Sequence, residues 1–195
     1  MRAFGFFLAL LTLALGQPLS AAAQWSVTSW VPTELDEHVT VQLPYVTEPA
    51  PIDGMQGSRQ YTTDTENIVL YVGSLDLRYQ PTYNPNGVVT VESLNKFFDR
   101  LIRTNVKSFR ADHIRLVSQG NAVFAGSPAR VARFSCFDEV RQQPAYLDFI
   151  YAWRGDVLYM FGSAYRLPET EATLADKKRF LESVRFDNKV PAKEL

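Results

Sequence analysis

The segment from His113 to Tyr165 constrains the fold of this chain more than any other part of the sequence. It holds four runs rich in β-branched and aromatic residues, and we expect strands at 113–118 (followed by a second apolar patch at 122–124), 129–137, 145–153 and 157–165. Their connections are short and made of turn-forming residues: Gly126-Ser127-Pro128, Gln142-Gln143-Pro144 and Arg154-Gly155-Asp156. Strands joined in this way pair antiparallel with their neighbours.

Three further strands are predicted before this segment. Val39, Val41 and Leu43 alternate with polar residues up to Pro44, which indicates a half-buried strand that ends there. A short strand is expected at 59–63, and residues 67–78 begin with an apolar run typical of an interior strand. We interpret residues 24–37 as a lead-in, and residues 44–57 and 79–87 as irregular loops.

Two helices complete the pattern. Apolar residues recur at spacings of three and four from Val91 to Val106, and Thr90 is a suitable N-cap. Pro168 opens a second helix over about 169–184, whose expected inward residues are Ala172, Leu174, Ala175, Phe180, Leu181 and Val184. The order βββαββββα, without alternating βαβ units, predicts an α+β domain with an antiparallel sheet and two main helices.

The first 23 residues have the organisation of a secretory signal peptide. An uncharged apolar run at 4–15 is shorter than the roughly 20 residues of a transmembrane span. Ala21 and Ala23 are the small residues that precede a cleavage site at Gln24. We therefore expect a cleaved signal at 1–23, one domain at 24–186 and a polar tail at 187–195, with no transmembrane segment after cleavage. The mature protein would be periplasmic or secreted.

The composition excludes several classes of function. The chain has 195 residues with a formal net charge of −1, so no strong field attracts nucleic acid or an anionic membrane surface. One cysteine and two histidines exclude a disulfide framework and a Cys-rich zinc site. Because neither a phosphate loop nor a metal-ligand motif occurs, we expect no cofactor and no metal.

The element order resembles the PsbP/Mog1-like sandwich, a fold seen in many small exported bacterial proteins. The resemblance spans about residues 37–186. It rests on the early strand ending in Leu43-Pro44 and on the closing run Phe180-Leu181-Glu182-Ser183-Val184-Arg185-Phe186, whose last Phe would pack back on the sheet. Named members of the family serve photosystem II or bind a small nuclear GTPase, and no residue here transfers either role to this chain.

Residues with catalytic side chains are few. Cys136 shares a strand face with Ala132 and Phe134, which favours a small buried hydrophobe over a nucleophile. His38 and His113 each follow an acid, but neighbouring side chains on a strand point to opposite faces. Arg154-Gly155-Asp156 spells an adhesion tripeptide, although a hairpin turn explains it fully.

The leading hypothesis is an exported, non-catalytic domain that binds an envelope protein or a small ligand. Its expected contact surface is the uncovered part of the sheet with the loops 44–57 and 79–87, because long irregular loops often carry function. The candidate binding residues are the polar-tipped aromatics Tyr79, Tyr83 and Tyr146. The alternative is a small periplasmic hydrolase that uses His113 with Cys136 or a serine, of which Ser127 and Ser163 lie next to glycines.

Overall fold

The computed structural model describes residues 30–50, 56–81, 83–84, 86–109, 114–139 and 141–187, with the backbone alone at 105–109. Its helices are α2 (Val91–Phe109) and α3 (Glu171–Glu182), with a short 3-10 helix at Leu77–Tyr79. The strands are β1 (Val31–Asp36), β2 (Val39–Leu43), β3 (Ser58–Asp64), β4 (Ile68–Asp76), β5 (Arg115–Phe124), β6 (Ser127–Asp138), β7 (Gln143–Arg154), β8 (Val157–Arg166) and β9 (Arg185–Phe186).

The larger sheet is fully antiparallel and has the strand order β3-β4-β8-β7-β6-β5. This confirms the α+β class and the four hairpin-connected strands of the second half. It also confirms an interior strand at 67–78, because β4 lies between β3 and β8. The first of the four strands is longer than expected: β5 runs without interruption through Gly120 to Phe124.

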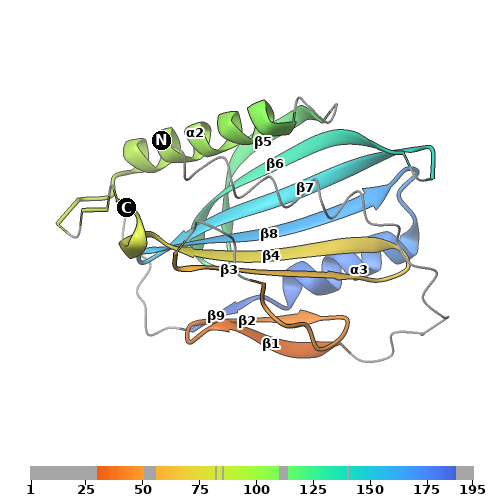
Figure 1. The fold of residues 1–195 in the computed structure, drawn as a ribbon, viewed down its shortest axis with the longest axis horizontal. Coiled ribbons are helices and arrows are strands. Elements are labelled where there is room, and N and C mark those ends of the chain that lie inside the picture. The colour runs from red at the N-terminus through yellow and green to blue at the C-terminus, as the bar shows by residue number, and fades with distance from the viewer. Residues whose placement is uncertain are drawn as a thin grey trace.

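The sheet is covered on both faces, which gives the domain its layered architecture (Figure 1). Helix α2 covers one face, where Phe98, Phe134 and Phe149 belong to one buried cluster. Helix α3 and a small sheet of order β1-β2-β9 lie on the other face, where Val41, Phe161 and Phe180 belong to a second cluster. Two apolar cores therefore share one sheet.

Helix α2 begins at the predicted cap. The Thr90 hydroxyl accepts the Ser93 N–H at 3.1 Å, and the Ser93 hydroxyl accepts the Thr90 N–H at 2.9 Å, so two otherwise unpaired donors are satisfied reciprocally. The apolar stripe faces the sheet as expected at Leu94, Phe98 and Ile102. Val91 is an exception, because it lies in the first turn and is 54% exposed.

The inward stripe predicted for helix α3 is confirmed only in its second half, where Phe180 and Val184 are buried and Leu181 packs against the second cluster. Thr173, Phe180 and Val184 are buried, and the half-buried Lys177 lies between them at helical spacing. The expected inward residue Leu174 is 50% exposed, and Ala172 and Ala175 are exposed as well. Apolar spacing alone did not predict this face, because two of its inward positions hold a threonine and a lysine. The lysine faces the sheet because its ammonium group has acidic partners there.

Two strands were missed, and they form the edges of the small sheet. β1 falls in the expected lead-in and contains Pro32, which an edge strand tolerates. β9 follows α3 directly and pairs with β2, while the Ser183 hydroxyl accepts the Gln42 N–H at 2.9 Å. Phe186 packs edge-on against Tyr159 at 5.3 Å between ring centroids, so the closing Phe does return to the sheet.

Candidate functional site: the outer edge of strand β3

The outer edge of β3 is occupied by the preceding segment of the chain. The Tyr45 hydroxyl donates to Asp64 Oδ1 at 2.8 Å, at the end of β3. Farther along, the Ala50 N–H donates to the Gln60 carbonyl at 2.8 Å, and the Gln60 N–H donates back at 3.1 Å. Residues 45–50 therefore run antiparallel to β3, and the bridge at Ala50 satisfies the outward backbone groups of Gln60.

The two loops predicted to carry function meet at the other end of β3. A methyl group placed on Gly57 would lie 2.5 Å from the Tyr79 ring, so the ring sits directly on this glycine. The Asp76 N–H donates to the Gly57 carbonyl at 3.0 Å, and the Leu77 N–H donates to the Asp156 carbonyl at 2.9 Å. Only glycine fits here, because Gly57 has a φ of +78° beneath an aromatic ring.

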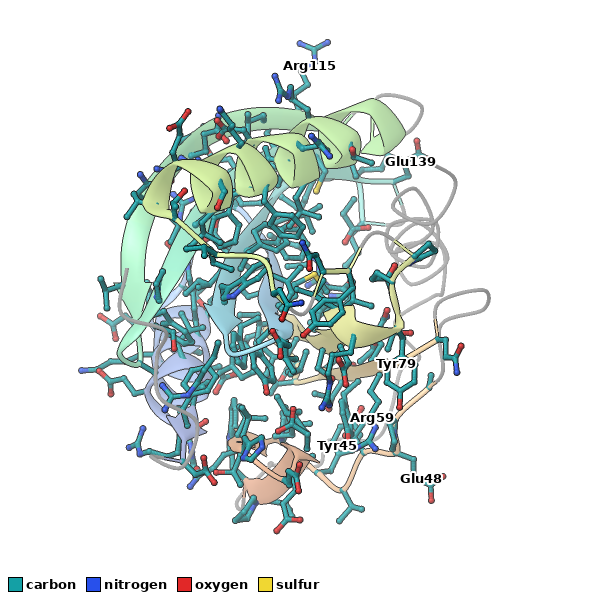
Figure 2. All side chains as sticks on the ribbon, turned by 90° about the vertical axis from the view of Figure 1, so that its left-hand side faces the viewer. Tyr45, Glu48, Arg59, Tyr79, Arg115 and Glu139 are labelled. Atoms are coloured by element: carbon teal, nitrogen blue, oxygen red, sulfur yellow. The ribbon has the colours of Figure 1, made fainter. Side chains whose placement is uncertain are left out.

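Exposed aromatic, apolar and charged side chains line this edge. We call the set the β3-edge surface, and it consists of Tyr45, Val46, Glu48, Arg59 and Tyr79. Figure 2 shows the four labelled members on the same side of the molecule. The exposed fractions are 44% for Tyr45, 77% for Val46 and 53% for Tyr79. The surface extends about 20 Å, since it follows β3, whose seven residues are joined by six steps of about 3.3 Å each.

The polar groups of the β3-edge surface are held in place. Arg59 Nη1 donates to the Leu35 carbonyl at 3.2 Å, which leaves other guanidinium donors for a ligand. Burial, together with the Asp64 carboxylate, raises the pKa of Tyr45 above its usual value, so its hydroxyl stays protonated and donates. Tyrosine and arginine are the residue types most enriched in protein–protein contact centres. The sequence did not point to Tyr45 and Arg59 as candidate site residues, because no pattern in the neighbouring residues shows that they are exposed beside β3.

Tyr83 lies near this surface but belongs partly to the interior. It packs against the cluster beneath α2 and is half-buried. Desolvation, and then its hydrogen bond with the Asp156 carboxylate, raises its pKa. Of the expected pair in this loop, Tyr79 therefore presents the larger free surface.

Tyr146 does not join the other two tyrosines. It lies near the start of β7, whereas Tyr79 lies beside the turn that follows the end of β7. Tyr146 also faces the α3 side, in opposite phase to Leu147 and Phe149, as predicted. On that side the sheet is incompletely covered over β6, where Val131 is 37% and Phe137 is 50% exposed.

The surroundings of Tyr146 form a saturated ionic network around Asp148. Arg133 donates twice to Asp148, at 2.7 and 2.8 Å, and its guanidinium lies 5.0 Å from the centre of the Tyr146 ring. Lys177 Nζ and the Tyr165 hydroxyl also donate to Asp148, at 2.5 and 2.9 Å. With its charged groups already satisfied by one another, this network anchors α3 to the sheet and has little capacity for a ligand.

The hydrolase hypothesis gains no support from the described residues. Ser127 and Ser163 are buried, with exposed fractions of 0% and 3%. Burial, and next the charge of Asp138, raises the pKa of the Cys136 thiol to about 11, which is the reverse of what a nucleophile needs. Cys136 packs against the cluster beneath α2, as a small hydrophobe does. His113 lies outside the described residues, as do Ala21, Ala23 and Gln24.

Cys136 is expected to react slowly with iodoacetamide in the native protein at pH 7. Relative to an unfolded thiol of pKa about 8.5, a pKa near 11 lowers the thiolate fraction roughly 300-fold. The measurement compares alkylation rates in buffer and in denaturant by intact mass. Fast native alkylation that His113→Ala slows would instead support the hydrolase.

The two remaining sequence motifs have structural partners. Arg154 of the adhesion tripeptide is only 8% exposed, and its Nη2 donates to the Asp187 carbonyl at 2.6 Å. His38 lies in the turn before β2, with Nδ1 3.3 Å from Asp187 Oδ2. Both residues hold the end of the described chain against the domain, and a receptor could not reach the guanidinium of Arg154.

In the described part of the chain, no helix is long and apolar enough to cross a membrane. Within the same residues, no three His, Cys, Asp or Glu side chains gather in a way that could hold a metal ion.

Solved structures resemble this chain, although no protein-family model and no curated protein matches its sequence. The solution structure of the cyanobacterial PsbP (CyanoP) from Synechocystis sp. PCC 6803 is 9% identical, covers 88% of this chain and 100% of its own, and has a TM-score of 0.51. LpqN of Mycobacterium tuberculosis, involved in cell envelope biogenesis, is 10% identical over 84% and 91%, with a TM-score of 0.42. The Ran-binding protein Mog1p of Saccharomyces cerevisiae is 11% identical over 81% and 96%, with a TM-score of 0.39.

The likeness to CyanoP supports the PsbP/Mog1-like fold that the element order and the closing Phe motif had suggested. The likeness to CyanoP concerns the fold alone.

Proposed function

We propose that this chain is an exported, non-catalytic domain of the bacterial envelope that binds a partner protein through the β3-edge surface. The export part of the proposal rests on the signal-like residues 1–23, with cleavage between Ala23 and Gln24. The polar tail at 187–195 remains part of the exported protein in this proposal.

The observation that carries the binding role is the convergence of Tyr45, Arg59 and Tyr79 along one protected strand edge. These side chains come from three separate segments, and each is supported by a hydrogen bond or by a ring packed on a glycine. A ligand therefore meets aromatic and cationic groups that lose little conformational freedom on binding. The surface is an extended strip of about 20 Å by strand geometry, which suits a protein segment better than a small molecule.

The test is site-specific photo-crosslinking in periplasm. A benzophenone amino acid at Tyr79 or at Arg59 is expected to capture the same protein, whereas the same group at Leu174 on α3, which is 50% exposed, captures none. Tyr79→Ala in the purified mature protein is then expected to weaken binding of the captured protein at least roughly tenfold, as for a contact-centre residue. Leu174→Ala serves as the matched control.

Two results would contradict the proposal. Equal capture from Tyr79 and Leu174 would show unspecific contact, and unchanged affinity in Tyr79→Ala would move the binding surface elsewhere. The export part is tested separately by the mass of the mature protein, which is expected to begin at Gln24. A cytoplasmic protein that still begins at Met1 would overturn it.

A further inference from the structure

Strand β5 is an uncovered edge of the larger sheet. It spans Arg115–Phe124 and pairs with β6 on one side, and among the described residues no strand pairs with its other side. The opposite edge, β3, is paired with the preceding segment through the bridge between Ala50 and Gln60, and Tyr45 bonds to Asp64 at its end. Exposed backbone edges of this length readily pair with another strand.

The register with β6 identifies the backbone groups that point outward. Val123 lies opposite Pro128, which has no N–H. These two residues therefore form a non-hydrogen-bonded pair of the ladder. Because bonded and non-bonded pairs alternate, Gln119, Asn121 and Val123 direct their N–H and carbonyl groups away from β6. These three residues are exposed, and Val123 is 78% exposed.

The edge lacks the features that usually prevent strand pairing. Leu116 through Phe124 carries no charged residue and no proline. Its one irregularity is a register shift at Val117, close to the start of the strand. Two apolar side chains, Val117 at 52% and Val123 at 78% exposure, face solvent on this strand.

We propose that β5 pairs antiparallel with β5 of a second copy of this chain, with Gly120 opposite Gly120 across a two-fold axis. In this register Gln119 faces Asn121 of the second copy, so their outward backbone groups bond each other and their amides lie side by side. Val123 comes opposite Val117, and Ser118 opposite Ala122. The amide pair Gln119–Asn121 and the apolar pair Val117–Val123 are thus matched in chemistry, and Ser118 and Ala122 are both small.

The second copy is favoured over another strand because the edge complements itself. The paired segment, Leu116 to Phe124, carries no charged residue, so the two copies meet no like-charge repulsion along it. The small residues Gly120 and Ala122 leave the α3-side face of the joined sheet free of steric conflict. The pairing uses a different edge from the β3-edge surface, so neither proposal depends on the other.

Disulfide crosslinking tests the register directly. Opposing residues in a non-hydrogen-bonded pair have Cα atoms about 4.5 Å apart, which a disulfide can span. Gly120 accepts a side chain, since an added methyl would find its nearest neighbour, Val131, at 4.0 Å. Gly120→Cys in a Cys136→Ala background is expected to form a covalent dimer under mild oxidation. Val131→Cys in the same background is on the neighbouring strand, 37% exposed, and is expected to stay monomeric.

Sedimentation of the mature protein tests whether the edge makes the dimer. The otherwise unaltered protein is expected to show a concentration-dependent dimer. Asn121→Pro removes an outward N–H without touching a bond to β6. Val123→Lys places a charge opposite the apolar Val117 of the second copy, so both variants are expected to be monomeric. Val46→Lys, at the covered edge, is expected to leave the dimer unchanged. Circular dichroism confirms that each variant is folded.

A protein that is monomeric at every accessible concentration overturns the proposal, even if its edge strand binds a strand of another protein. So does a dimer that survives both Asn121→Pro and Val123→Lys, or equal crosslinking through residues 120 and 131.

Discussion

Replacing Asp148 with alanine is expected to lower the free energy of unfolding by about 2–4 kcal/mol, because the partly buried Arg133 and Lys177 lose the carboxylate that they share. Asp148 and Lys177 have side-chain exposures of only 18% and 17%, and Arg133 and Tyr165 also lose their acceptor. The network joins β6, β7, β8 and α3, so the loss loosens α3 as well as the sheet. Urea denaturation followed by circular dichroism at neutral pH measures the change.

The stability that Asp148 contributes is expected to depend on pH. Burial acts to raise its pKa, but hydrogen bonds from Arg133, Lys177 and Tyr165 outweigh burial and hold it below the usual aspartate value. A carboxylate with a lowered folded-state pKa stabilises the protein above its unfolded pKa, and this contribution is lost as pH falls through the folded pKa. The difference between the unsubstituted protein and Asp148→Asn is therefore expected to be full at neutral pH and to shrink under acid conditions.

Glu92→Ala provides the matched control for Asp148. Glu92 also pairs with a lysine, Lys96 at 2.6 Å, but the two side chains are 78% and 72% exposed. Loss of such a surface pair costs about 0.5 kcal/mol or less. A Glu92→Ala effect as large as that of Asp148→Ala, or a pH-independent Asp148→Asn effect, would contradict an anchoring role for the network.

Substitution of Gly162 by alanine is expected to cost about 2–3 kcal/mol through overpacking. Gly162 is buried in β8, and an added methyl would lie 2.6 and 2.8 Å from two atoms of the Phe149 ring and 3.2 Å from Tyr71 Cβ. Phe149 belongs to the cluster beneath α2 and stacks on Tyr151 at 5.8 Å, so its ring has little room to move. Thermal unfolding of the single variant measures the loss.

A double-mutant cycle identifies the ring as the cause. Phe149→Leu removes the crowded atoms, so Gly162→Ala is expected to cost less in that background than in the unsubstituted protein. Gly120→Ala is the control, because its methyl would meet only Val131, at an ordinary contact distance of 4.0 Å, and would gain strand propensity. A Gly162→Ala cost that Phe149→Leu leaves unchanged, or that Gly120→Ala equals, would place the cause in the backbone instead.

Local patterns in the sequence predicted most of the elements of this fold. Short turns between apolar runs predicted β5 to β8, because a chain that reverses within a few residues can only pair with its neighbour. The Thr90 cap and the apolar spacing predicted α2, because helix formation depends on near neighbours. The sequence did not predict β1 and β9. Both strands are short, and they are defined by their pairing with β2 and not by a local pattern of their own.

The candidate site depended more strongly on tertiary contacts. The predicted loops do meet, but Tyr79 is placed by the glycine beneath it, and Tyr45 by a hydrogen bond to Asp64. Tyr146, expected in the same set, lies toward the opposite end of β7. Exposure of an aromatic residue is decided by what packs over it, and local sequence carries little of that information.

By itself, the sequence determined the α+β class, the antiparallel pairing of β5 to β8 with their neighbours, and which residues of β2, β6 and β7 share a face, since turn chemistry and alternation act over a few residues. It also determined that Cys136 faces the same side as Phe134. Only the tertiary structure decided which loops share a surface, which edge of the sheet is covered, and that Lys177 faces Asp148. These features arise from contacts between segments far apart in the chain, where neighbouring residues do not specify the partner.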